Sequence, residues 1–277
     1  MEDKPSSALF GPGGNSKSFY DAGYKHTKQA PAWLCGIGLD AYEYEAGNGV
    51  SAGEATLREI GAEAQKYGIR MSLHTPYFIS LSGTDPQKRL KSIDYIEKSL
   101  WAAELLGADT IVIHCGSAGK ISRAEAMRLS ADTLFKMLEK LGGTSVAFGV
   151  ETMGKQNQLG TLDARLAPVV DFGHLNARSC GGVFPSADSY RAVFDRIGEA
   201  LGADKAKYMH CHFSKIEWTA LGEKRHLTFA DQTFGPDFEP LMEAVAREGL
   251  CPRIICESAG TMAEDALAMK NYYKSLI

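Results

Sequence analysis

The chain has 277 residues, of which 44% are hydrophobic and 23% are charged, and its formal net charge is −4. This is the composition of an ordinary globular protein, and the negative charge argues against a protein that coats nucleic acid nonspecifically. No apolar run is long enough to cross a bilayer. The N-terminus has no signal-peptide pattern, so we expect a cytoplasmic protein. The six cysteines form no CxxC pair, which argues against a zinc knuckle.

Strand-like and helix-like patterns alternate along the chain. Short runs of apolar residues predict eight strands, and apolar residues at helical spacing predict six helices. In chain order these are strands 7–11 and 39–45, helix 54–68, strand 70–74, helix 85–107, strand 110–115, helix 122–143, strands 145–151 and 167–172, helix 186–202, strand 207–213, helix 236–249, strand 253–257 and helix 261–276. The stretch 154–166 is mostly loop, with room for one helical turn.

Eight strand units in a chain of this length predict an α/β fold, and specifically one (β/α)8 TIM barrel domain over residues 1–277. A doubly wound open sheet is the alternative, but nothing in that fold calls for eight units. No linker rich in Pro, Gly or Ser divides the chain into two domains.

Polar residues recur where the predicted strands end. Six of the seven histidines lie at or just after a strand end, and the run VVDFGH at 169–174 adds an aspartate. Each residue alone is commonly a hydrogen-bonded rim residue. Together, however, eight strand ends point into one mouth, where acids and imidazoles are tolerable neighbours if they share divalent cations. The candidate metal ligands, which suit zinc, manganese or iron(II), are His74, His114, Glu151, Asp171, His174, His210, His226 and Glu257.

The seventh predicted strand carries two histidines, two positions apart. Because side chains alternate along a strand, His210 and His212 face the same side. We expect His210 to be a ligand and His212 to orient the ligands from behind, with a buried structural role as an equal alternative for His212.

At this point the sequence resembles endonuclease IV, the metal-dependent apurinic/apyrimidinic endonuclease family. The resemblance runs over nearly the whole chain and depends on the order and spacing of several short motifs. They are SLHTPYFISLSG (72–83), VIHCG (112–116), VET (150–152), DFGH (171–174), HCHFSK (210–215) and RHLTFADQTFGPDFEPL (225–241). The same fold superfamily contains xylose isomerase-like sugar isomerases and epimerases.

The resemblance implies two or three divalent ions, zinc first among them. One would be held by His74, His114 and Glu151, a second by Glu151, Asp171, His210 and Glu257, and a third by His174 and His226. The family also has an aspartate two residues before the last histidine, where this chain has Lys224. Glu223, Asp231 or a substrate phosphate would then complete the third site. Alternatively Lys224 and Arg225 bind a phosphate, or they are solvated loop charges.

The implied activity is hydrolysis of DNA on the 5′ side of an abasic site, with a metal-bound hydroxide as the nucleophile. Glu151 and Glu257 would be the catalytic carboxylates, Glu151 between two metals and Glu257 as a ligand that orients the water. Tyr77 matches a family residue near the gap in the base stack. The family usually carries an inserting arginine after the second strand, but here no arginine precedes Arg58 in that loop.

Two other functions fit parts of the pattern. A sugar isomerase or epimerase would use one divalent ion held by Glu151, Asp171, His210 and Glu257. The other four candidate histidines have less use in a one-metal enzyme, which favours phosphodiester hydrolysis. A barrel that only binds a metal or a carbohydrate is the third reading, and the intact set of strand-end carboxylates argues against it.

Overall fold

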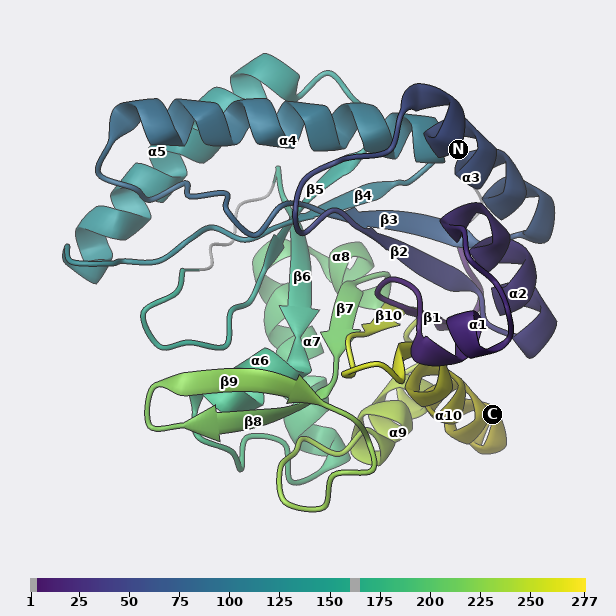
Figure 1. Ribbon diagram of the computed structural model, residues 1–277. Coiled ribbons are helices and arrows are strands. Elements are labelled where there is room, and N and C mark those ends of the chain that lie inside the picture. The colour runs from purple at the N-terminus through teal and green to yellow at the C-terminus, as the bar shows by residue number, and fades with distance from the viewer. Residues whose placement is uncertain (1–3, 160–164) are drawn as a thin grey trace.

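The computed structural model describes residues 4–159 and 165–277, and eight parallel strands form its centre (Figure 1). Their order around the sheet is β1-β10-β7-β6-β5-β4-β3-β2. An isolated parallel bridge between Gly13, directly after β1, and Glu43 of β2 joins the two edges of the sheet and nearly closes it. The prediction of a TIM barrel is confirmed, with strands β1 (Leu9–Pro12), β2 (Ala41–Glu45), β3 (Arg70–His74), β4 (Thr110–Ile113), β5 (Ala147–Glu151), β6 (Ala167–Asp171), β7 (His210–Phe213) and β10 (Arg253–Cys256).

The closure between β1 and β2 depends on a glycine. A Cβ atom on Gly11 would lie 1.9 Å from the carbonyl oxygen of Ala41, which is backbone and cannot move aside. Only glycine lets the two strands approach this closely. The sequence therefore fixes the point at which the barrel closes.

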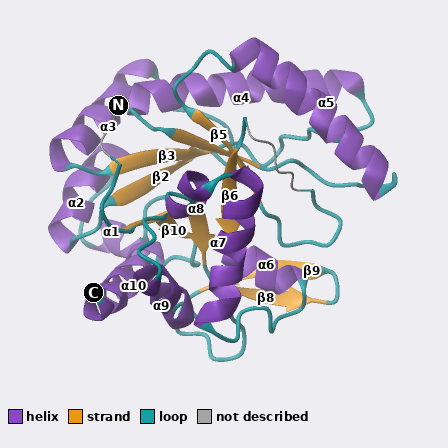
Figure 2. Ribbon diagram, turned by 180° about the vertical axis from the view of Figure 1, so that it is seen from behind, coloured by secondary structure: helices purple, strands orange, loops and turns teal. Residues whose placement is uncertain are grey.

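Helices cover the outside of the barrel (Figure 2). The six predicted helices are present with boundaries within a few residues: α3 (Glu54–Tyr67), α4 (Pro86–Leu106), α5 (Arg123–Leu141), α7 (Ala187–Leu201), α9 (Glu239–Arg247) and α10 (Met262–Leu276). Local chemistry explains their ends. The side chains of Asp85 and Ser122 accept hydrogen bonds from backbone N–H groups in the first turns of α4 and α5. Gly68 and Gly107 end α3 and α4 in the left-handed conformation.

Several elements were not predicted from the sequence. They are the helices α1 (Lys17–Asp21), α2 (Ala30–Ile37), α6 (Phe172–Arg178) and α8 (Ala203–Lys207), a 3-10 turn at Thr27–Gln29, and a hairpin of β8 (Lys215–Thr219) and β9 (Gly222–Leu227). Most are too short to show a helical period. The hairpin lies beside α6, apart from the barrel strands (Figure 1). Within the predicted loop 154–166, residues 160–164 fall outside the described residues.

Charged residues at the N-terminal ends of the strands are paired with one another. Arg70 begins β3, Arg253 begins β10, and both contact Asp109 just before β4.

Among the described residues, no helix combines the length and the apolar character that a membrane span requires.

Candidate metal centre

The C-terminal ends of the strands surround a cavity of about 790 Å³. Glycines and polar side chains from several strands and from the β8–β9 hairpin form its wall. The titratable residues that line it are Glu45, His74, Tyr77, His114, Lys155, His174, Glu223, His226 and Glu257. Nearly all the predicted ligands therefore reach one mouth or the layer directly beneath it.

The first cluster consists of His74, His114 and Glu151, whose ligand atoms lie within 4.8 Å of one another. Glu151 Oε2 lies 2.8 Å from His114 Nε2 and 3.4 Å from His74 Nε2. His74 Nδ1 donates a hydrogen bond to the carbonyl of Thr75 at 2.8 Å, so its Nε2 faces the cavity. Burial acts to lower the pKa of His74, but Glu151 and Glu45 outweigh it and raise that pKa to about 10. The cluster therefore attracts positive charge.

The second cluster consists of Glu151, Asp171, His212 and Glu257. Three buried atoms here, Glu151 Oε1, Asp171 Oδ2 and His212 Nδ1, have no hydrogen-bond partner among the described residues. His174 Nδ1 lies 3.0 Å from Glu151 Oε1, but it also lies 3.0 Å from the carbonyl oxygen of Thr152, which accepts its hydrogen bond. Carboxylate oxygens and an imidazole nitrogen that are buried together without partners reduce the stability of the protein unless a cation binds them.

The pKa of Glu257 shows the effect of the neighbouring acids in the second cluster. Burial, together with repulsion from Glu151 and Asp171, raises the pKa of Glu257 to about 8, although His212 acts in the opposite direction. Glu257 Oε1 lies 3.3 Å from His212 Nδ1. Burial and two acidic neighbours therefore favour the protonated form of this carboxyl group, and a cation beside it would favour the ionised form.

The third cluster consists of His174, Glu223 and His226. Glu223 lies 3.4 Å from His174 Nε2 and 3.9 Å from His226 Nε2. The other ring nitrogens point away, His174 Nδ1 to the carbonyl of Thr152 and His226 Nδ1 to the hydroxyl of Ser214. Of the groups considered for completing this site, Glu223 is the one that lies there.

A bulge in the hairpin explains this placement. The register shifts between Glu217, which is opposite Arg225, and Trp218, which is opposite Glu223, so Lys224 is an extra residue on β9. Glu223 and His226 thereby share a face although three positions separate them. Lys224 and Arg225 both contact Glu217 at 2.6 Å on the exposed surface of the hairpin.

The remaining candidates occupy other positions. Asp231 accepts hydrogen bonds from the backbone N–H groups of Thr233 and Phe234, within a turn outside the third cluster. Tyr77 stands at the mouth with 60% of its surface exposed. Its ring centroid lies 5.1 Å from that of His74, and its hydroxyl donates to Glu45 at 3.3 Å.

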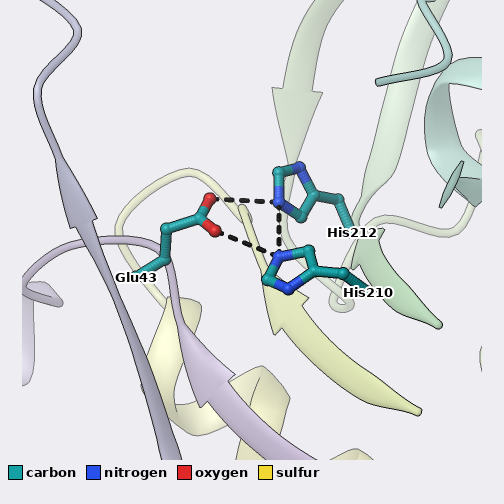
Figure 3. Close-up of side chains that lie close together, drawn as sticks. All are labelled: Glu43, His210 and His212. Atoms are coloured by element: carbon teal, nitrogen blue, oxygen red, sulfur yellow. Dashed lines mark hydrogen bonds and ion pairs between the residues drawn. The ribbon is translucent and has the colours of Figure 1, made fainter. Parts of the chain in front are cut away.

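The structure exchanges the positions expected for the two histidines of β7. His212, opposite Asp171 in the sheet, joins the second cluster, and His210 does not. His210 lies one layer deeper in the barrel, 3.0 Å from Glu43 (Figure 3). Alternation along a strand fixes which face a residue is on, but the alignment with β6 fixes which layer it reaches.

Sequence reasoning overlooked Glu43 and Glu45 on β2. Glu43 is fully buried, and it forms further candidate groups with His210 and His212 and with Glu45 and Glu257. Burial acts to raise the pKa of Glu43, but attraction to His212 and His210 keeps that pKa well below its usual range. The signal was present in the run AYEYE, where two acids at alternate positions must face the same side as each other.

Carboxylate oxygens and imidazole nitrogens are the donors that zinc, manganese and iron(II) accept, and the unpartnered atoms of the second cluster have the right chemistry to bind such an ion. The fold and these clusters together define a TIM barrel with a candidate centre for several divalent cations. The model of the xylose isomerase-like TIM barrel family matches residues 32–272, and the chain belongs to that family.

Two relatives illustrate its neighbours in sequence. The chain is 29% identical to an uncharacterised protein of Methanocaldococcus jannaschii over 85% of this chain and 88% of that protein. It is 27% identical to a probable endonuclease 4 of Acholeplasma laidlawii over 72% of each.

Solved structures share the fold at lower identity. Endonuclease IV from Thermus thermophilus superposes with a TM-score of 0.68 and 18% identity, covering 98% of both chains. A 3-keto-D-glucoside 4-epimerase from E. coli superposes with a TM-score of 0.66 and 15% identity, covering 98% of this chain and 99% of the epimerase. These structural similarities show the shared fold and do not distinguish endonuclease from epimerase activity.

Proposed function

We propose that the chain is a metal-dependent hydrolase of DNA phosphodiesters that acts, like endonuclease IV, on the 5′ side of abasic sites. The observation that carries the proposal is the presence of three ligand clusters at one mouth, two of which share Glu151. Adjacent cations suit in-line displacement at phosphorus, because they neutralise charge on both the attacking and the leaving oxygen. A single-metal enzyme needs only one of the clusters.

The first and second clusters would each hold one divalent ion, with Glu151 between them, and the third cluster would hold another. When bound, such ions lower the pKa of water and stabilise negative charge on a phosphate. Glu151 is suited to the shared position because its Oε2 faces His114 and its Oε1 faces His212. The preferred ion is zinc, with manganese or iron(II) as alternatives.

Glu257 is the residue best placed to orient the attacking water and to take its proton. One of its oxygens lies 3.3 Å from His212 Nδ1 and the other lies 3.9 Å from His226 Nδ1, so it faces both the second and the third clusters. Without bound metal, burial and repulsion from Glu151 and Asp171 raise the pKa of Glu257 to about 8. A bound divalent ion would lower that pKa, so Glu257 would be ionised and able to accept a hydrogen bond from the water.

Residues at the rim would contact the DNA. The exposed ring of Tyr77 stands beside His74 and His114, where a flipped-out sugar would enter. Lys224 and Arg225 expose about half and two-thirds of their side chains, and their charges would contact a phosphate beside the lesion. In this proposal the ion pairs with Glu217 hold the side chains of Lys224 and Arg225 in position for the phosphate.

The test combines metals per chain with nicking of an abasic-site duplex, with and without chelator. Two or three ions and chelator-sensitive nicking are expected. His174→Asn is the informative variant, because His174 belongs to the third cluster and is not one of the four residues of the second. It should lower nicking and remove about one ion per chain. Nicking that survives chelation, or no nicking at any metal load, would refute the proposal.

A divalent-metal sugar isomerase or epimerase is the alternative. The specific observation in its favour is that the second cluster alone offers three carboxylates and one imidazole, a complete set for one ion. This alternative predicts one bound ion, interconversion of ketoses, and no effect of His174→Asn on metal content.

A further inference from the structure

Glu43 lies in the interior of the barrel, one layer beneath the second cluster, and has one hydroxyl group and two imidazoles around it. Its Oε2 accepts a hydrogen bond from the hydroxyl of Ser72 at 2.8 Å and lies 3.0 Å from His210 Nε2. Its Oε1 lies 3.0 Å from His212 Nε2, and the Nε2 atoms of His210 and His212 lie 3.3 Å from each other. Figure 3 shows both imidazoles directed at this one carboxylate. All of these side chains are buried.

His212 therefore faces two acidic regions with its two ring nitrogens. Nε2 points to Glu43, and Nδ1 points to Glu257 and Glu151, at 3.3 and 3.5 Å. Glu43 Oε1 has no well-aligned hydrogen bond among the described residues, but its negative charge 3.0 Å from Nε2 stabilises a proton on that nitrogen of His212. The lone pair of Nδ1 is then directed at the second cluster, as a metal ligand requires.

His210 shows that the group of Glu43, His210 and His212 is not itself arranged to hold a cation. His210 Nδ1 is buried and has no hydrogen-bond partner among the described residues. A cation on His210 Nε2 would force the proton onto Nδ1, where a buried N–H would lack an acceptor. With the proton on Nε2, the positive edge of the ring lies 3.0 Å from the Glu43 carboxylate and Nδ1 keeps only a lone pair.

We propose that Glu43 is a positioning residue that fixes the tautomer and ring orientation of His212 for metal binding at the second cluster, with His210 as the second imidazole that contacts Glu43. The inference depends on the metal centre of the proposed function, but not on the reaction catalysed there. His74 and His174 are held by neutral backbone carbonyls, of Thr75 and Thr152. His212 has a full negative charge behind it, which makes its imidazole a stronger ligand.

The first test measures metal binding and not catalysis. Zn²⁺ and Co²⁺ are titrated into metal-free wild type, Glu43→Gln and His210→Asn, with calorimetry and the Co²⁺ absorption spectrum as readouts. Glu43→Gln should weaken one binding step by about 10–100-fold, the usual effect of losing such a partner, and should change the Co²⁺ spectrum. Ser72→Ala is the matched control, because it removes a hydrogen bond to Glu43 without touching His212 and should have a smaller effect.

His210→Asn separates this inference from a fourth metal site. The number of ions per chain should stay that of wild type, because His210 is not a ligand. Loss of one whole equivalent in His210→Asn, wild-type affinity in Glu43→Gln, or no metal bound to wild type would each overturn the proposal. Failure to nick abasic DNA, with metal binding still weakened in Glu43→Gln, would refute only the proposed function.

A second measurement needs no variant and covers the case in which Glu43→Gln does not fold. Long-range ¹H–¹⁵N spectra of the wild type report the tautomer of each histidine. His212 and His210 should both carry the proton on Nε2 in the protein loaded with zinc. A proton on Nδ1 of His212 would overturn the proposal.

Discussion

At the N-terminal ends of the strands, the chain itself supplies the counter-charges of a partly buried acid. Asp109 contacts Arg70 and Arg253, at 2.7 and 2.5 Å. Burial acts to raise the pKa of Asp109, but the two arginines outweigh it and hold that pKa well below its usual range. Arginine keeps its charge in proteins, so this compensation is permanent.

At the C-terminal ends, the acids face histidines instead. Glu151 contacts His114 and His74, and Glu257 contacts His212. Histidine can give up its proton near neutral pH, so the positive charge at this end is exchangeable, and a divalent cation can replace the protons. The two ends of the barrel therefore compensate their acids differently. Arginines give a permanent positive charge at the N-terminal ends of the strands, and histidines give an exchangeable one at the candidate metal centre.

The largest effect is expected from Glu151→Gln at the mouth. This change removes the acid shared by two clusters, so bound metal should be lost and transition-state stabilisation of several kcal/mol should disappear with it. That corresponds to a fall of about three orders of magnitude in kcat/KM on abasic duplex. Circular dichroism should show an intact fold. Full activity of this variant would end the scheme.

Asp109→Asn makes the same chemical change at the opposite end and is the matched control. Removing one partner of a buried ion pair costs about 3–5 kcal/mol. Because a quarter of the Asp109 side chain is exposed, we expect a loss of about 2 kcal/mol in the free energy of unfolding, measured with urea. Activity per folded molecule should not change. A fall in activity without a fall in stability would contradict the division between the two ends.

The pH dependence of stability should differ in sign between the ends. Asp109 has a lowered pKa, so its contribution is present above about pH 4 and is lost as the pH falls further. His74 and Glu257 have pKa values raised to about 10 and about 8. Their contributions are present in acid and are lost as the pH rises through those values.

Metal-free protein should therefore lose stability between about pH 7 and pH 10, measured by urea unfolding across that range. Zinc should reverse the loss, because it stabilises the native state by about 2.7 kcal/mol at one hundred times its Kd. Metal affinity should itself rise with pH, through about 8 as Glu257 loses its proton and towards about 10 as His74 loses its proton. A metal-free protein that is equally stable at pH 7 and pH 10 would contradict this picture of the mouth.

The smallest effect is expected from Tyr77→Phe at the rim. The ring beside His74 and His114 is kept, and only the hydrogen bond from the hydroxyl to Glu45 is lost. Such a bond contributes about 1 kcal/mol, which corresponds to a change of about fivefold in kcat/KM. Tyr77→Ala should cost more, because it also removes the stacking surface. Equal effects of the two variants would show that the ring has no role.

Much of the fold followed from local patterns. Alternation and helical spacing located all eight barrel strands and six helices, because these periods are set by the backbone of a few consecutive residues. The convergence of His74, His114, Glu151 and Glu257 at one mouth also followed, because parallel strands in a barrel share one C-terminal end. Elements shorter than two helical turns, such as α6, gave no period to detect.

The sequence by itself determined which residues stand on the inner face of each strand. Only the tertiary structure decided the layer that each one reaches. It placed His212 and not His210 in the second cluster, brought Glu43 from β2 beneath it, and used a bulge to turn Glu223 toward His174. The physical reason is that side-chain alternation is a property of one strand, whereas depth in a barrel depends on how neighbouring strands are aligned, and that alignment is set by residues far apart in the chain.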